Sequence, residues 1–500
     1  MDNHKHAKIF FIIASLFLIG LFYAGSGRVV WFDEAFSVIY SQHDISYIIQ
    51  PHDVHPFGFY LLLHGYIQGN GVDLEKLRTF SLFFIIPAFL FILLALDEMF
   101  PGFYEDRGAY MYFMAILLFS TTIFHYFTEI RMYAMAMAFT AVSFYCMIRF
   151  VNEKGKNKWN GIFFVVFSAL ALYAHYYTAL FFLMECSYII WHFRWGVFKI
   201  MRAYAIGFCV LVAPLLVYFY FQRMRIVTMW FKDSDWFSML STYNYYFFHS
   251  FGESVPAINS WFGVLFIVLC FVLIGIGIGR SKGKEKKYMM WMLLFCIVPP
   301  FIGMIINLFV MKVYHHRFFI FAAWMFLFLV SYSIHKIKRN YVKAIICIFM
   351  LSIMIFNVHT YWTTFNPELI GAADKLKEVG CNEDIYVLHE SVFSMFPSMY
   401  YNQVNNCTKL KEYVLTPESA YGFSIPNKML NSVGFDAVNR TEVLFNNTDA
   451  LQFADKGFYY FKHKGKIGND TFDCKNIYSS DGLWLDKCQK KPVVISIRIN

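Results

Sequence analysis

Residues 79–98 read TFSLFFIIPAFLFILLALDE, an apolar run long enough to cross a hydrocarbon core of about 30 Å. Similar runs recur along the chain. Of its 500 residues, 58% are hydrophobic and only 15% are charged, whereas soluble proteins carry roughly a quarter charged residues. The net charge is +9, but lysine and arginine are scattered between the apolar runs, which argues against nucleic-acid binding. We therefore predict a polytopic α-helical membrane protein.

The apolar runs predict about eleven transmembrane helices, with residues 1–360 as the membrane domain. We expect the first helix to be retained as a signal anchor, because no small-residue cleavage site follows it cleanly. The expected spans are 8–26, 79–98, 109–125, 132–150, 160–175, 177–193, 203–221, 260–279, 288–311, 318–334 and 341–360.

Basic residues predict the orientation. With these spans, four basic loops and the N-terminus fall on one side, which the positive-inside rule makes cytoplasmic. The first outer loop, 27–78, and the tail, 361–500, then face outward from a plasma membrane or an endoplasmic reticulum membrane. The four loops carry Lys154, Lys156 and Lys158; Arg194, Lys199 and Arg202; Arg280, Lys282, Lys284, Lys286 and Lys287; and Lys336, Lys338, Arg339 and Lys343.

The tail is predicted to be a small extracytoplasmic α/β domain. Residues 367–379 have helical spacing, and 384–388, 457–462 and 493–499 are rich in strand-forming residues. Sequons begin at Asn406, Asn439, Asn446 and Asn469, which suits a glycoprotein. Cys381, Cys407, Cys474 and Cys488 make the even set that two disulfides require, with three pairings open.

Polar residues gather on the predicted outer side. Ionisable groups beside a bilayer are costly, so such a cluster predicts a functional site. Because these residues lie at the ends of spans rather than at their middles, they favour a reaction at the membrane surface over transport. The set comprises Asp33, Glu34, His52, Asp53 and His55 in the first outer loop, then Glu129, Arg131, His175, His316 and Arg317.

These residue types indicate transfer from a lipid phosphate. A carboxylate can act as general base towards an acceptor hydroxyl, and arginine and histidine can stabilise a phosphate leaving group. A lipid tail would also need the apolar bundle. Residues 57–68 are too short to span and are predicted to form an interfacial helix beside the site.

Six short motifs occur in this order: Asp33-Glu34, Asp53-Val54-His55-Pro56, Leu77-Arg78-Thr79-Phe80-Ser81, Glu129-Ile130-Arg131-Met132-Tyr133-Ala134, His175-Tyr176-Tyr177 and His316-Arg317-Phe318. Together they resemble the GT-C glycosyltransferases, closest to the branch of the dolichyl-phosphate-mannose protein mannosyltransferases and the aminoarabinose transferases. The resemblance covers roughly residues 8–335. Where family members carry two prolines, this chain has Pro56-Phe57 followed by Gly58.

The resemblance implies Asp33 as catalytic base, Glu34 as its acidic neighbour, and Arg131 or Arg317 at the donor phosphate. It implies a polyprenyl-phosphate-linked sugar as donor and a single inverting displacement by a hydroxyl of a glycan, lipid or protein. It implies no cofactor.

Several alternatives stay open from the residues alone. His52, Asp53 and His55 could hold a divalent metal with Asp33, or Asp53 and His55 could cap a helix before Pro56. Glu129 and Arg131 could pair with each other, His175 could be structural, and His316 and Arg317 could anchor the interface. At the level of function, a transporter or flippase of lipid-linked sugars and a non-catalytic scaffold are the alternatives.

Overall fold

The computed structural model describes residues 13, 15, 20, 30–51, 53–225, 236–248, 261–310, 314–363, 374, 375, 377, 378, 385–389, 392–405, 410–415, 441–444, 458–463, 472–480 and 483–490. Nearly all of the first predicted span, 8–26, and His52 lie outside these residues.

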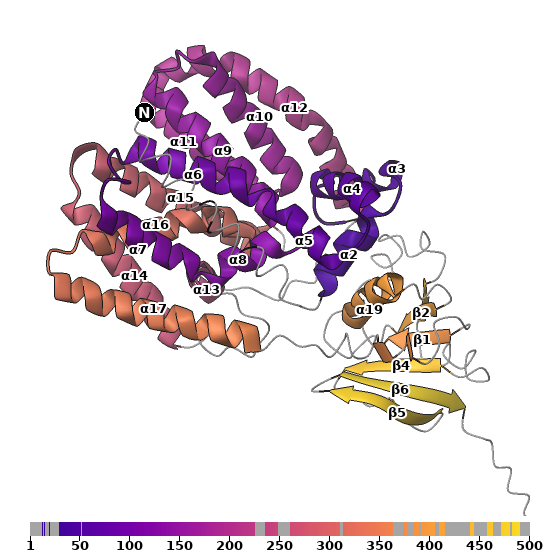
Figure 1. Cartoon of the computed structure of the whole chain (residues 1–500). Helices are drawn as coiled ribbons and strands as arrows, with labels where there is room; N and C mark the ends of the chain where they lie inside the picture. Colours follow the sequence, from indigo (N-terminus) through magenta and orange to yellow (C-terminus); the bar gives the residue numbers. More distant parts are fainter. Residues whose placement is uncertain are drawn as a thin grey trace, which may run out of the picture.

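The membrane domain is helical throughout its described part (Figure 1). The helices are α2 (Phe32–Ser41), α3 (Ile45–Ile48), α4 (Gly58–Asn70), α5 (Leu74–Leu82), α6 (Ile85–Met99), α7 (Arg107–Leu118), α8 (Thr121–Thr128), α9 (Tyr133–Asn152), α10 (Lys158–Ala174), α11 (Thr178–Phe193), α12 (Val197–Arg225), α13 (Trp236–Tyr245), α14 (Trp261–Arg280), α15 (Gly283–Phe309), α16 (Ala323–His335) and α17 (Asn340–Thr363), with 3-10 helices η1 (Arg194–Gly196) and η3 (His316–Ala322).

The prediction of a polytopic helical membrane protein is confirmed. Among the described residues, seven helical stretches are long and apolar enough to span a bilayer, or eight if the bent pair α7–α8 forms one span. Helices occupy every predicted span from 79–98 onward, but α10 and α11 have only 17 and 16 residues. The count of eleven is therefore not confirmed.

Two local features depart from the predicted spans. The segment 109–125 is not one helix: α7 and α8 meet at 58°, and the Ser120 hydroxyl between them caps α8 by accepting the Ile123 N–H. The short helix α13 was not predicted. Both features lie near the polar residues described below.

The first outer loop is folded into helices at one end of the bundle (Figure 1). The predicted interfacial helix is present as α4. It begins at Gly58, where a Cβ atom would lie 2.5 Å from the carbonyl oxygen of Tyr173 in α10. This close approach explains why a glycine follows Pro56-Phe57 here.

Ion pairs from the predicted cytoplasmic side lie at the opposite end of the bundle. Arg149 contacts Glu153 at 2.6 Å and Glu98 at 3.6 Å near the C-terminal ends of α9 and α6. Since α9 has 20 residues, its two ends are about 30 Å apart. The outer polar residues and this basic end are thus separated by one bilayer thickness.

The tail forms a six-stranded sheet in the order β3-β2-β1-β4-β6-β5. Strands β1 to β4 are parallel, β5 and β6 are antiparallel, and α19 (Val392–Val404) connects β1 to β2. The predicted strands at 384–388 and 457–462 are present as β1 and β4. The predicted strand 493–499 and most of the predicted helix 367–379 lie outside the described residues. The strands are β1 (Ile385–His389), β2 (Leu410–Leu415), β3 (Thr441–Leu444), β4 (Phe458–His463), β5 (Phe472–Ser480) and β6 (Leu483–Lys490).

The strand register favours one disulfide pairing. Cys474 of β5 lies directly opposite Cys488 of β6, and opposed residues of antiparallel strands have Cα atoms about 4.5–5.5 Å apart. That separation suits a disulfide. We therefore expect Cys474–Cys488 to form, and non-reducing peptide mapping by mass spectrometry should recover the linked β5–β6 peptides.

A Cys474→Ser control should release Cys488 as a thiol that alkylating reagents label. Linkage of Cys474 to Cys381 or Cys407, which lie outside the described residues, would contradict this pairing.

Candidate active site

Helix α2 carries Asp33 and Glu34 in its first turn, where carboxylates are favoured by the helix dipole. The sequence predicted the residues but not the helix. Every residue from Asp33 to Ser41 is buried, and the Ser37 hydroxyl donates to the Asp33 carbonyl at 2.8 Å. The buried helix fixes both carboxylates against the bundle.

Glu34 forms a buried ion pair with Arg78 of α5. The Arg78 Nη2 and Nε atoms donate to the two carboxylate oxygens at 3.0 and 3.3 Å. The backbone N–H groups of Ile130 and Trp31 also donate to this carboxylate, at 3.2 and 3.4 Å. Glu34 thus connects the start of α2, helix α5 and the turn after α8. These contacts favour a structural role for its carboxylate over a catalytic one.

Asp33 instead faces Arg317. An Asp33 carboxylate oxygen lies 2.9 Å from Arg317 Nη1, and both side chains are about 7% exposed. The guanidinium also lies over the rings of Trp31 and Phe318, at 5.9 and 5.7 Å. Residues 284 positions apart therefore form one charged pair in the site.

A second arginine contacts the same helix. Arg131 Nη1 donates to the hydroxyls of Ser37 and Tyr60, each at 3.1 Å. Tyr60 in turn donates to Asp53 at 2.5 Å. Asp53 also accepts the His55 N–H at 3.3 Å, as expected of a turn-capping carboxylate. Asp53 therefore reaches the arginine through Tyr60.

The predicted histidines lie against the same cluster. The rings of His55 and His175 are 5.4 Å apart, and Phe318 lies 5.0 Å from His175. His316 contacts the Tyr245 ring at 3.8 Å. Both His55 and His175 are buried among aromatic rings and arginines, so they line the site rather than the solvent.

Glu129 occupies a different edge of the cluster. The Trp31 indole donates to Glu129 Oε1 at 2.8 Å. Among the described residues, buried Oε2 accepts no hydrogen bond and has His125 Nε2 4.0 Å away. Burial, reinforced by the carboxylates of Glu34 and Asp33, raises the pKa of Glu129 to about 8. Glu129 is therefore largely protonated at neutral pH. Its carboxyl group accepts a hydrogen bond from Trp31, and its described contacts do not support the alternative of a pair with Arg131.

Burial also shifts the pKa values of the neighbouring loop residues Asp53 and His55. Burial raises the pKa of Asp53, against the opposing effects of Arg131 and Tyr60. Burial and the nearby Arg131 lower the pKa of His55 well below its usual range. The cationic character of the site is thus concentrated on its two arginines.

Several polar atoms in this cluster are buried and have no hydrogen-bond partner among the residues that the structure describes. They are Nε of Arg131, Nε of Arg317, Nε2 of His175 and the Tyr133 hydroxyl. His175 and Tyr133 are adjacent, with rings 5.8 Å apart. Since buried polar groups are normally paired, these four atoms mark a place for a polar ligand, and the two arginines favour an anionic one.

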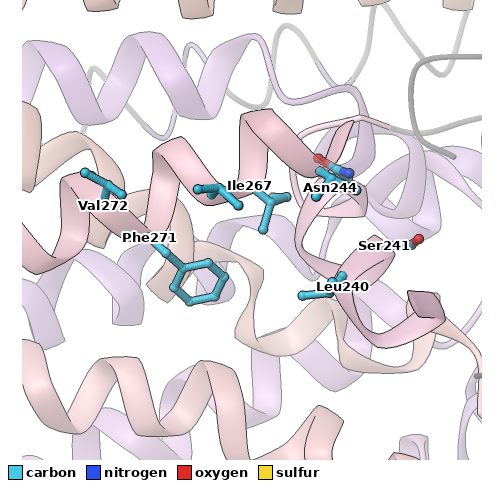
Figure 2. Close-up of a pocket in the computed structure, with 8 residues that line it drawn as sticks. Leu240, Ser241, Asn244, Ile267, Phe271 and Val272 are labelled. Atoms are coloured by element: carbon cyan, nitrogen blue, oxygen red, sulfur yellow. The ribbon is translucent and has the colours of Figure 1, made fainter. Parts of the chain in front are cut away.

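An apolar cavity lies next to this cluster, between α13 and α14 (Figure 2). Its volume is about 340 Å³. Among the described lining residues, Asn244 is the one whose buried amide oxygen accepts no hydrogen bond. The next residue, Tyr245, contacts His316, so α13 connects the cavity to the site. The lining includes Leu240, Val264, Ile267, Val268, Phe271 and Val272.

The metal alternative finds no support in the described part of the chain, where no group of three His, Cys, Asp or Glu side chains is arranged to hold an ion. Its proposed ligand His52 lies outside that part. The structure instead pairs Asp33 with Arg317 and Asp53 with Tyr60.

Sequence reasoning missed several contributors. Arg78 was part of a quoted motif but had no assigned role, although a buried arginine needs a carboxylate partner. Tyr60 lies in the predicted interfacial helix, and Gln222 at the end of α12 donates to the Asp53 and His55 carbonyls. No local pattern distinguishes Tyr60 or Gln222 from the other polar residues of such helices.

The chain shares its fold with a protein of known structure. No family model and no curated protein matches the chain. Among solved structures, it is similar to ArnT from Cupriavidus metallidurans in the apo state, with a TM-score of 0.61 and 9% identity, covering 96% of this chain and 98% of that one. The same protein bound to undecaprenyl phosphate gives a TM-score of 0.56 and 9% identity, covering 95% and 97%. The chain therefore shares the fold of ArnT from Cupriavidus metallidurans.

The pKa of Glu129 predicts a pH-dependent stability. Its folded value of about 8 lies above the ordinary value of 4.5, so the folded state binds the extra proton and loses stability as the pH rises between these values. Glu129→Gln keeps the acceptor for Trp31 but carries no titrating group. We expect its unfolding midpoint to exceed that of the wild type by a margin that grows from pH 5 to 8.

Thermal unfolding in detergent at several pH values measures this margin. Glu153→Gln, at the basic end of the bundle, is the control. A margin that shrinks with rising pH would contradict the assignment.

Proposed function

We propose that this protein is a membrane glycosyltransferase that moves a sugar from a polyprenyl-phosphate donor to an acceptor hydroxyl on the non-cytoplasmic face. The observation that carries the proposal is the pairing of Asp33 with Arg317 beside the unpartnered nitrogens of Arg131, Arg317 and His175. A base and a phosphate site are thereby adjacent.

The site supplies both halves of a displacement. Asp33 takes the proton of the acceptor hydroxyl, and the acceptor oxygen bonds to the anomeric carbon of the sugar. The bond from that carbon to the phosphate oxygen breaks, and its electron pair stays on the lipid phosphate. Arg131 and Arg317 stabilise this negative charge. Their electrostatic effect is stronger because the site excludes water.

The lipid half of the donor accounts for the apolar cavity. Its wall residues on α13 and α14 offer hydrocarbon contacts (Figure 2), and Tyr245 connects it to His316 and hence to Arg317. We assign the phosphate-proximal part of the polyprenyl chain to this cavity. A protein of the same fold has been solved with undecaprenyl phosphate, which supports a polyprenyl-phosphate donor.

The separation of the site from the basic loops supports an outward-facing site. Arg149 and its acidic partners lie at the far end of α9 from Tyr133 and Arg131. With the positive-inside rule, that end is cytoplasmic. The acceptor is then a hydroxyl of a glycan, lipid or protein outside the cytoplasm, and the tail faces the same compartment.

Asp33→Asn tests the base. Removing a general base costs about 100-fold or more in rate, so we expect transfer of a labelled sugar from its polyprenyl phosphate to fall by at least that factor. Asp44→Asn is the matched control, because Asp44 is exposed in the same loop. Transfer by Asp33→Asn at the wild-type rate would refute the role of Asp33.

Arg131→Gln tests the phosphate site. A charge-assisted hydrogen bond contributes about 1.5–3 kcal/mol, so binding of undecaprenyl phosphate should weaken at least about tenfold. Arg149→Gln, which removes an arginine at the opposite end of the bundle, should bind normally. Equal affinity of Arg131→Gln and wild type, measured by microscale thermophoresis, would contradict the assignment.

A further inference from the structure

Helix α19 of the tail packs directly on α2, the helix that carries Asp33 (Figure 1). The two helices are more than 350 residues apart in sequence. Because α19 also contacts β1 and β2, it joins the sheet of the tail to the first outer loop. The contact surface includes fully buried Tyr400, at 1% exposure, and Asn402 at 4%.

Two adjacent tyrosines of α19 bind the two ends of this loop. The Val30 N–H donates to the Tyr401 hydroxyl at 2.8 Å, one residue before the cap of α2. The Tyr400 hydroxyl donates to the Val72 carbonyl at 2.8 Å, one residue before Asp73 caps α5. One turn of one helix therefore holds the start of α2 and the start of α5.

A third contact holds the other end of α2. The amides of Gln403 and Gln42 exchange hydrogen bonds at 3.2 and 2.5 Å, and Gln42 is the residue that ends α2. Helix α2 is consequently fixed by α19 at both ends, while its inner face carries the ion pairs of Asp33 and Glu34.

The contacts of α19 coincide with the frame of the site. Glu34 lies on α2 and its partner Arg78 lies on α5. Tyr401 and Tyr400 bond to Val30 and Val72, which directly precede the cap residues of these two helices. A shift of either helix would move Asp33 relative to Arg317, and small displacements of a reacting group slow catalysis strongly.

We propose that Tyr400 and Tyr401 are positioning residues, through which the tail holds the helix bearing Asp33 in its reactive place. The proposal rests on the proposed function for its catalytic consequence. The hydrogen bonds described for Tyr401 and Tyr400 go to the backbone of Val30 and Val72, so their effect on Asp33 is indirect. The tail thus belongs to the machinery of the membrane domain instead of being an independent appendage.

The test uses full-length Tyr400→Phe, Tyr401→Phe and the double variant, each of which removes only a hydroxyl. Tyr66→Phe is the matched control, since the Tyr66 hydroxyl donates to the Lys76 carbonyl at 3.0 Å between the same loop and α5, without the tail. Loss of one hydroxyl-to-backbone hydrogen bond changes an equilibrium or rate constant by about a factor of five. We expect kcat to fall about fivefold in each single variant and further in the double variant.

The KM for the lipid-linked sugar should stay within about twofold, because the phosphate-binding arginines are untouched. Hydrogen exchange gives a readout independent of transfer: amides of residues 30–36 should exchange about fivefold faster in Tyr401→Phe than in wild type or Tyr66→Phe. If the wild type transferred no sugar, the proposed function would fail, and the exchange rates alone would still decide whether α19 holds α2.

Unchanged kcat with unchanged exchange would overturn the proposal. So would an equal loss of kcat in Tyr66→Phe, because the effect would then belong to any hydrogen bond of the loop. If the double variant does not purify as a monodisperse species, the two single variants carry the test.

Discussion

The buried ion pair of Glu34 and Arg78 is the interaction on which the site depends. Two charges removed from water are costly unless their hydrogen bonds are well satisfied. Here Arg78 supplies two donors and the backbone at Ile130 and Trp31 supplies two more. The pair can form only when α2, α5 and the turn after α8 are all in place, and that condition fixes Asp33.

Around this pair, the remaining ionisable groups leave the arginines of the site in excess. Burial keeps Glu129 largely protonated and His55 uncharged near neutral pH. Asp33 contacts Arg317, while Arg131 donates to the hydroxyls of Ser37 and Tyr60. An anion completes such a site electrostatically. The hydrocarbon tail of a lipid phosphate needs an apolar surface, and the cavity between α13 and α14 offers one.

Much of this arrangement could be predicted from the sequence, because its signals are local. Apolar runs located the helices, and the cost of charge near a bilayer singled out Asp33, Arg131 and Arg317. The outer loop was harder. Helix α2 carries charged residues in its first turn and was not predicted, and Arg78 had no role, because its partner lies 44 residues away.

The sequence by itself determined the class of fold, the polar residues and their common end of the bundle, since hydropathy and charge act residue by residue. Only the tertiary structure decided which polar groups meet: Glu34 with Arg78, Asp33 with Arg317, and the Tyr401 hydroxyl of the tail with the Val30 N–H. These pairings depend on packing between helices far apart in the chain. Two carboxylates that are adjacent in the sequence thereby have different partners.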